Sequence, residues 1–210
     1  MVHKLRNRIY NFIIKNATEH CYKNCLEYFS DNTVILDVGI GNGAMMDNFH
    51  SLIKSRGLKI TGIDVNKHYL HHCECIIKNH QLKDNVEIYC KSVEDYEPVK
   101  KEYFDFILFS MSFMLFHNQG LILDRIKDWL KPRGKVLFFQ AMFKKRFWLM
   151  DIIKPRLKYF TTIDFGKVTY EKDFFSLLDE RKLFISEDRL IKKKWFGGEY
   201  RMIITSFGND

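Results

Sequence analysis

A glycine-rich turn follows an apolar run in the stretch Thr33-Val-Ile-Leu-Asp-Val-Gly-Ile-Gly-Asn-Gly43. The residues at 33–37 predict a short buried strand, and the amphipathic stretch after Gly43 predicts a helix. Glycines between a strand and a helix let the backbone turn sharply and let a ligand approach where a Cβ would collide. Open parallel sheets bind ligands beyond the carboxyl ends of their strands. The stretch therefore predicts a nucleotide-like cofactor at the edge of such a sheet.

Strand-like runs of β-branched and aromatic residues alternate with helix-length amphipathic stretches along the rest of the chain. This alternation is typical of a parallel sheet with crossover helices, so the fold class is expected to be α/β. Further strands are predicted at 58–64, 86–90, 104–109, 135–140, 183–191 and 200–206. Helices are predicted after the glycine turn, from an Asn66 cap towards His80, over 119–130, and from a Thr169 cap to Leu178.

The chain is expected to form one domain over residues 1–210, because 210 residues with 46% hydrophobic content suffice for one well-buried core. Residues 1–30 are expected to form N-terminal helices, 33–140 the cofactor-binding core, and 169–210 a C-terminal helix and strands. The aromatic and basic segment 143–168 is not required by the core sheet. It is expected to cap the substrate site.

The composition also bears on cellular location and on metals. No apolar run reaches the roughly 18–20 residues of a membrane span, and the basic N-terminus lacks the apolar core of a signal peptide. Five cysteines form an odd set, which favours free thiols in a reducing compartment, so a cytoplasmic location is expected. The run His71-His-Cys-Glu-Cys75 has no partner pair at zinc-finger spacing, so an ordinary helix and no metal site are predicted there.

Two carboxylates at the ends of the first two predicted strands bear on the chemistry of the ligand. Asp37 would repel a pyrophosphate, whereas it would attract the cationic ammonium and sulfonium groups of S-adenosylmethionine. Asp64 ends the next strand at about the 20-residue spacing expected of an acid that binds ribose hydroxyls. Charge thus favours the methyl donor over a nicotinamide dinucleotide, whose relaxed fingerprint Gly39-x-Gly41-x-x-Ala44 the turn also satisfies.

Together these features resemble the class I S-adenosylmethionine-dependent methyltransferases over about residues 33–140. The stretch Asp37–Gly43 matches the first motif of that family, Gly62–Val65 the second, and Leu130–Leu137 the motif before the fifth strand. The resemblance implies a three-layer Rossmann-like fold, in which a mostly parallel seven-stranded sheet has an antiparallel last strand. It also implies S-adenosyl-L-methionine as the cofactor.

The resemblance assigns the cofactor to a set of residues spread over four motifs. The first strand and its turn would hold the methionine end, Asp64 the ribose, and Val65 would lie against adenine. Ser92 stands where the family often carries an adenine-contacting aspartate, and Ser110 would line the mouth where donor and acceptor meet. The complete implied set is Asp37, Gly39, Gly41, Gly43, Asp64, Val65, Ser92, Val93 and Ser110.

The acceptor side carries fewer signals. The run Phe109–Met114 lacks the signatures of the family's amine, cytosine C5 and arginine methylases, so those subclasses are not expected. Methyl transfer requires mainly positioning, and a general base only when the acceptor is protonated. His117 is the candidate catalytic base or substrate contact, with a surface or helix-capping histidine as the alternative. An apolar acceptor pocket is expected from Phe113, Phe116, Phe143, Trp148 and Tyr159.

The functional hypothesis is methyl transfer from S-adenosylmethionine to a small molecule, since no further module is visible. The net charge of +8 and the lysine clusters at 144–146 and 192–194 leave methylation of RNA or protein open. The sequence also leaves open a non-catalytic cofactor-binding protein and, less readily, a nicotinamide-dependent oxidoreductase. Phe147 and Trp148 leave peripheral membrane contact open. The oligomeric state is not predicted.

Overall fold

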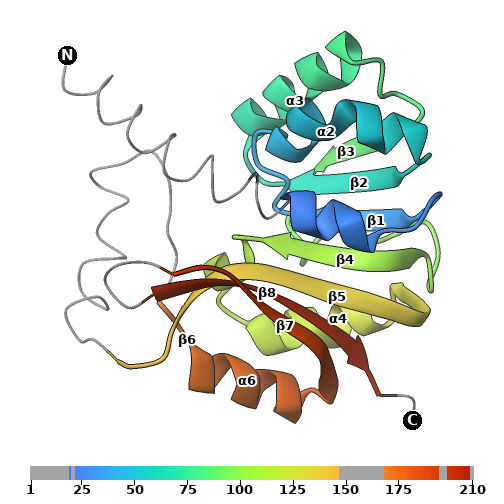
Figure 1. The fold of residues 1–210 in the computed structure, drawn as a ribbon. Helices are drawn as coiled ribbons and strands as arrows, with labels where there is room; N and C mark the ends of the chain where they lie inside the picture. The colour runs from blue at the N-terminus through green and yellow to red at the C-terminus, as the bar shows by residue number, and fades with distance from the viewer. Residues whose placement is uncertain (1–18, 20–21, 147–167, 194–197, 209–210) are drawn as a thin grey trace.

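One twisted sheet runs through the described part of the chain, with helices against both of its faces (Figure 1). The computed structural model describes residues 19, 22–146, 168–193 and 198–208. The strands are β1 (Val34–Val38), β2 (Lys59–Asp64), β3 (Val86–Cys90), β4 (Phe104–Ser110), β5 (Leu130–Phe143), β6 (Thr169–Tyr170), β7 (Leu183–Lys193) and β8 (Gly198–Phe207).

The strand order is β3-β2-β1-β4-β5-β8-β7, and the short β6 pairs with the end of β5. Strands β1 to β5 are parallel to one another, whereas β8 is antiparallel to both β5 and β7. The predicted α/β class and the mostly parallel sheet with an antiparallel last strand are therefore confirmed. The carboxyl ends of β1, β2 and β4 meet at one edge, which is where the glycine turn lies.

Each face of the sheet is covered by its own helices, which makes three layers (Figure 1). The helices are α2 (Ala44–Ser55), α3 (Lys67–Asn79), the 3-10 turn η1 (Phe113–Leu115), α4 (Gln119–Lys127) and α6 (Glu171–Glu180). Apolar side chains of α2, α3 and the helical residues 22–28 pack on one face, and those of α4 and α6 pack on the other. The central strands are apolar on both faces because both are covered.

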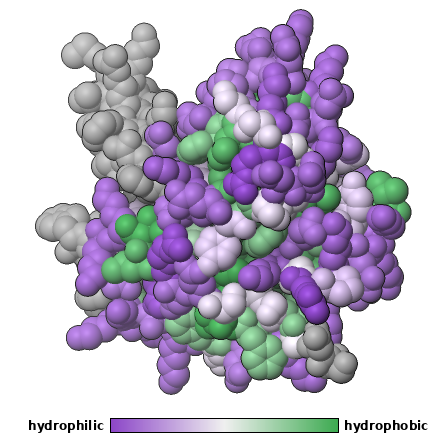
Figure 2. Space-filling model, turned by 45° about the vertical axis from the view of Figure 1, so that its right-hand side comes forward, coloured by the Kyte–Doolittle hydropathy of each residue, from purple (hydrophilic) through white to green (hydrophobic). Residues whose placement is uncertain are grey.

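Aromatic rings dominate the core between the sheet and the α4–α6 layer. The rings of Phe109 and Phe138, on adjacent strands, stack with centroids 5.4 Å apart. Phe113 of η1 and Phe174 of α6 meet Phe138 edge-on at 4.9 and 5.2 Å. These contacts fix the loop after β4 to the sheet. Most large hydrophobic side chains of the described residues are buried in the core, and the face shown in Figure 2 is mostly hydrophilic.

Two predicted boundaries were wrong, and tertiary pairing explains both. Thr169 does not cap α6: it pairs with Met142 as part of β6, so the helix starts at Glu171 after a Tyr170 that makes no side-chain cap hydrogen bond. Strand β5 begins at Leu130 instead of residue 135. The helix predicted over 119–130 ends at Lys127, because Leu130 pairs with Phe104, and the register then shifts before Lys135 pairs with Phe106.

Of the other fold predictions, one is confirmed and others concern residues outside the described part of the chain. Asn66 caps α3 as predicted, since its side chain accepts hydrogen bonds from the backbone N–H groups of His68 and Tyr69. Most of the predicted N-terminal helices and residues 147–167 of the predicted cap lie outside the described residues, and the single domain stays a prediction. Within the described residues, no helix is both long and apolar enough to span a membrane.

Replacing Asn66 tests the cap directly. Asn66→Ala removes the acceptor for the first N–H groups of α3 and should lower the free energy of unfolding by about 1 kcal/mol. Chemical denaturation with an unchanged slope measures the loss. The matched change Asn79→Ala, at the exposed end of the same helix, should stay within about 0.5 kcal/mol of the parent. Equal losses in the two variants would show that the cap does not stabilise the helix.

Candidate functional site

The glycine turn after β1 is built from three left-handed residues. Gly39, Gly41 and Gly43 have φ of 80°, 60° and 78°, a region that residues with a Cβ rarely adopt. The N–H of Gly39 donates to the carbonyl oxygen of Ile63 at 2.8 Å, which ties the turn to the end of β2. A Cβ on Gly39 would lie 2.6 Å from the Cβ of Ser112, so the turn also closes against the loop after β4.

Asp64 braces this turn as well as facing the candidate cofactor cleft. Its Oδ2 accepts a hydrogen bond from the N–H of Gly41 at 2.9 Å, and its Oδ1 accepts from the N–H of Asn66 at 2.8 Å. Each carboxylate oxygen can accept more than one hydrogen bond, so capacity for two ribose hydroxyls remains. The spacing predicted the ribose role of Asp64, whereas its bond to the turn was not predicted.

Two side chains of α3 also hold the turn. Cys73 donates from Sγ to the carbonyl oxygen of Gly41 at 3.3 Å, and His72 donates from Nδ1 to that of Asn42 at 2.9 Å. Burial, followed by the charges of Asp37 and Asp64, raises the pKa of Cys73 to about 12, which keeps the thiol protonated as a donor. These contacts were not predicted, because the run that contains both residues was interpreted only as a helix.

Asp37 is the most unusual charged group of the site. It is fully buried, and neither carboxylate oxygen has a hydrogen-bond partner among the described residues. Burial first, and the negative charge of Asp64 second, raise its pKa to about 7. A buried carboxylate without a partner is costly, and a nearby cation would stabilise its charged form. Asp37 lies one residue before the wall of the candidate cleft, so its environment fits a cationic ligand group.

A cleft of about 280 Å³ opens beside the turn, at the carboxyl ends of β1 and β2. Gly39, Asp64, Val65, Ser92 and Val93 line it, which brings five of the nine predicted cofactor residues together. Val65 is 68% exposed, and such an open apolar side chain suits contact with a flat ring. The cleft walls do not include Asp37, Gly41, Gly43 or Ser110.

Ser92 has a structural role that its sequence context did not reveal. Its hydroxyl donates to Oδ2 of Asp95 at 2.8 Å and accepts from the N–H of Asp95 at 3.2 Å. One lone pair of the hydroxyl remains for a ligand donor. The adenine contact of Ser92 stays a prediction, with Asp95 as the residue that orients it.

The loop after β4 supplies the opposite wall of the cleft through Ser112 in place of Ser110. Ser110 is buried at the end of β4, and Met111, with φ of 58°, then turns the chain. Ser112 lines the cleft, and its Oγ donates to the carbonyl oxygen of Val38. Because Ser112 also contacts Gly39, the two loops close on each other. Ser112 was not predicted as a site residue, and only the tertiary contact identifies it.

His117 is exposed and Phe116 is half-buried, and both line the cleft. Both residues also line a second cavity of about 170 Å³. Of the residues predicted to line an acceptor pocket, Phe116 is the one that lines these two cavities among the described residues. Phe113 is part of the aromatic core and Phe143 is buried without lining either cavity, while Trp148 and Tyr159 lie outside the described residues. The catalytic role of His117 stays a prediction.

Comparison with known proteins places the chain in a family. Residues 29–161 match the family described as a methyltransferase domain. The chain is 30% identical over 133 residues to the ubiquinone/menaquinone biosynthesis C-methyltransferase of Wigglesworthia glossinidia brevipalpis, covering 62% of this chain and 52% of that protein. It is 26% identical over 157 residues to the malonyl-[acyl-carrier protein] O-methyltransferase 2 of Ilyobacter polytropus, covering 75% and 55%. The chain spans about half the length of these curated relatives.

Solved structures support the fold. The geranyl diphosphate C-methyltransferase of Streptomyces coelicolor A3(2) superposes with a TM-score of 0.71 at 11% identity, covering 91% of this chain and 78% of that one. The [4+2]-cyclase SpnF superposes with a TM-score of 0.69 at 14% identity, covering 85% and 76%. At such identities the likeness concerns architecture alone, and it agrees with the family match. The chain therefore belongs to the class I S-adenosylmethionine-dependent methyltransferase family.

Proposed function

We propose that this protein transfers the methyl group of S-adenosylmethionine to a small-molecule acceptor. The observation that carries the proposal is the buried Asp37 carboxylate, which has no hydrogen-bond partner within the described part of the chain and directly precedes Val38 of the cleft wall. The names of the two curated relatives, which refer to quinone biosynthesis and to malonyl-[acyl-carrier protein], support methyl transfer to small acceptor groups. Methylation of RNA or protein and non-catalytic cofactor binding are competing functions, and the experiments below distinguish them.

The residues present fit the cofactor by charge and by shape. Asp64 offers carboxylate lone pairs to ribose hydroxyls, while Val65 and Val93 offer apolar surface to adenine. Gly39 lets the turn approach Ser112 closely, where a Cβ would collide, and its backbone lines the cleft. When bound, S-adenosylmethionine supplies an activated methyl group on a sulfonium sulfur. The negative charge of Asp37 stabilises a cation held at this end of the sheet.

The protein's own contribution to the reaction is then positioning and proton removal. The turn, braced by Asp64 and Cys73, holds one wall of the cleft, and Ser112 and Phe116 hold the other. Fixed walls orient two reactants and lower the entropic part of the barrier. His117, which lines the cleft, accepts a proton from an acceptor that is protonated at neutral pH.

Binding of the donor should be linked to a proton. Because the pKa of Asp37 is raised to about 7, the carboxyl group is mostly protonated below that pH, and a nearby cation favours ionisation. Binding at about pH 6 should therefore release close to one proton, and affinity should rise as the pH approaches about 7 and then level off. Calorimetry in buffers of different ionisation enthalpy measures the release.

The control for this linkage is Asp37→Asn, which keeps the shape but cannot ionise. It should bind S-adenosylmethionine more weakly at pH 8 and lose the Asp37 part of the proton release. Titration of the ligand's own groups is common to both proteins, so the difference between them isolates Asp37. Identical proton release by the two proteins would contradict the role of Asp37.

Asp64 should contribute strongly to cofactor affinity. Asp64→Asn weakens the charge-assisted bonds to ribose and to the turn, so binding of S-adenosylhomocysteine should fall about tenfold or more. The exposed Asp84→Asn serves as the matched control and should leave the affinity unchanged. Calorimetry at one pH gives both values. An Asp64→Asn protein that folds and binds as tightly as the parent would remove Asp64 from the site.

His117 should affect turnover and not donor binding. An acceptor is first identified by offering labelled donor to pools of metabolites, lipids, RNA and protein. On that acceptor, His117→Ala should lower kcat about 100-fold if the transferred proton goes to the imidazole, with donor affinity nearly unchanged. The exposed His68→Ala, on α3, is the control. Normal turnover by His117→Ala would make this residue part of the scaffold, and label found only in RNA or protein would overturn the small-molecule proposal.

A further inference from the structure

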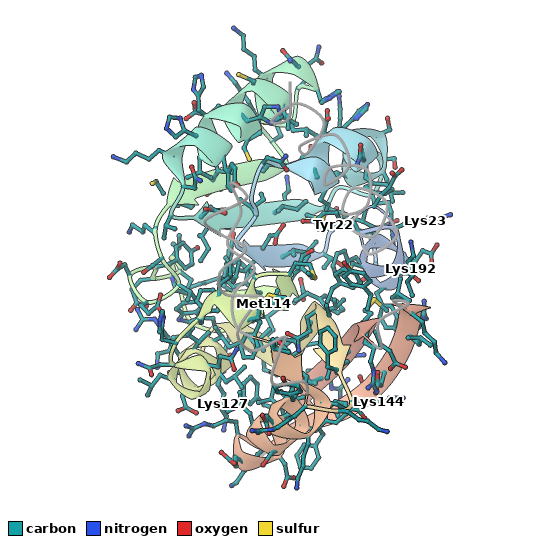
Figure 3. All side chains as sticks on the ribbon, turned by 90° about the vertical axis from the view of Figure 1, so that its left-hand side faces the viewer. Tyr22, Lys23, Met114, Lys127, Lys144 and Lys192 are labelled. Carbon is teal, nitrogen blue, oxygen red and sulfur yellow. The ribbon has the colours of Figure 1, made fainter. Side chains whose placement is uncertain are left out.

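A second cavity shares a wall with the candidate cofactor cleft. Its volume is about 170 Å³, and it lies between η1, the start of α4 and the β6–α6 segment. Phe116 and His117 line both spaces, so the two spaces adjoin at these residues. Figure 3 looks onto the carboxyl ends of the parallel strands, and Met114, which also lines the second cavity, lies near the middle of the view. An acceptor held here would lie next to the donor cleft and to His117.

The walls of this cavity are largely aromatic and are held in place by the core. Phe174 packs against Phe113 and Phe138 with ring centroids 6.0 and 5.2 Å apart. Tyr170 is fixed by the pairing of β6 with the end of β5. With Phe116, these rings give three aromatic sides to a small space. Such walls favour a flat apolar ligand, because offset and edge-on ring contacts add to the burial of apolar area.

Asp173, the carboxylate among the described residues that line this cavity, is paired. It receives two hydrogen bonds from Nη2 of Arg146, at 3.0 and 2.8 Å, and this guanidinium also lies over the ring of Tyr170 at 5.3 Å. The adjacent guanidinium lowers the attraction of this carboxylate for a cationic ligand, and the carboxylate lowers that of the guanidinium for an anion. The geometry therefore favours an uncharged ligand.

Polar groups nevertheless remain for a hydroxylated ligand. Gln119 uses its side-chain N–H to donate to the carbonyl oxygen of Phe113 at 2.8 Å, which leaves its amide oxygen as an acceptor. His117 offers an imidazole where the cavity adjoins the cofactor cleft. One hydroxyl can donate to each group, so the polar groups distinguish a hydroxylated ring from a bare hydrocarbon.

We propose that the second cavity is the acceptor pocket and that it takes an uncharged, hydroxylated aromatic ring. This inference rests on the proposed function and names the substrate class for it. Most ligand pockets have volumes of roughly 300–1,000 Å³, so a space of about 170 Å³ suits about one ring. The volume, the aromatic walls and the paired charges all restrict the same space, and His117 connects it to the donor cleft.

In methyl transfer to this ring, the hydroxyl proton goes to the imidazole of His117, and the oxygen forms a bond to the methyl carbon. The bond between that carbon and the donor sulfur breaks and leaves its electron pair on sulfur. The products are an aryl methyl ether and S-adenosylhomocysteine, and His117 returns the proton to solvent. No oxidant, reductant or metal is required by this balance.

The test uses catechol as the probe, with the protein saturated with S-adenosylhomocysteine. Cyclohexane-1,2-diol is the matched ligand, since it carries the same hydroxyl groups without an aromatic ring. Ligand-observed NMR should give an affinity for catechol at least about tenfold higher than for the diol, corresponding to about 1.4 kcal/mol. Equal affinities would overturn the assignment to an aromatic ring.

Filling the cavity locates the binding. Thr169→Trp adds bulk at the cavity wall, whereas Lys172→Trp adds the same bulk at an exposed position of α6 outside it. The first variant should lose at least about tenfold in catechol affinity, while the second should not. Both should retain binding of S-adenosylhomocysteine. Undiminished catechol binding by a folded Thr169→Trp protein would overturn the pocket.

A further measurement covers the case in which Thr169→Trp disturbs β6. Nuclear Overhauser contacts between the catechol protons and the rings of Phe116 and Tyr170 are expected in the unmodified protein, and their absence overturns the proposal. The two levels of inference fail differently. Loss of S-adenosylhomocysteine binding by the unmodified protein contradicts the proposed function, whereas intact cofactor binding without catechol at this site contradicts only the acceptor pocket.

Discussion

The site depends on one electrostatic constraint, which is a carboxylate buried near the end of β1. Asp37 is fully buried, yet neither of its oxygens forms a hydrogen bond with any residue that the structure describes, and burial raises its pKa to about 7. Such a group is tolerated where its charged form gains a partner, and functional sites are where such perturbed groups gather. The glycine turn, the cleft and the loop after β4 are all arranged around the strand that carries it.

The turn next to this carboxylate is held by contacts from outside itself. Asp64 accepts from Gly41, Cys73 donates to Gly41, and Ile63 receives the N–H of Gly39. Three left-handed glycines alone would make a flexible segment, because glycine has the largest backbone freedom. Bracing by β2 and α3 converts this freedom into a fixed wall, which is what a site that works by positioning requires. The hydrogen bonds that stabilise the turn therefore also fix one wall of the candidate cofactor cleft.

The parts that could be predicted are those encoded locally. Apolar runs and the glycine turn identified the long strands and the α/β class, the spacing after the turn identified Asp64, and the family resemblance identified Val65. Asn66 was identified by its place before a helix. The contacts of Ser112 with the turn and the pairing of β6 involve residues far apart in the sequence, so no local pattern indicated them. The predicted N-cap role of Thr169 was wrong for this reason, because Thr169 pairs with Met142 in a strand.

The central claim concerns the ionisation of one side chain, and it can be observed directly. A carbon-13 NMR titration of the aspartate carboxyl groups, with Asp37→Asn used to assign the signal, measures the pKa of Asp37 in the free protein and in the protein saturated with S-adenosylmethionine. The account predicts a value of about 7 in the free protein and a marked fall on binding. An ordinary carboxyl pKa in the free protein, or a raised value unchanged by the ligand, would contradict it.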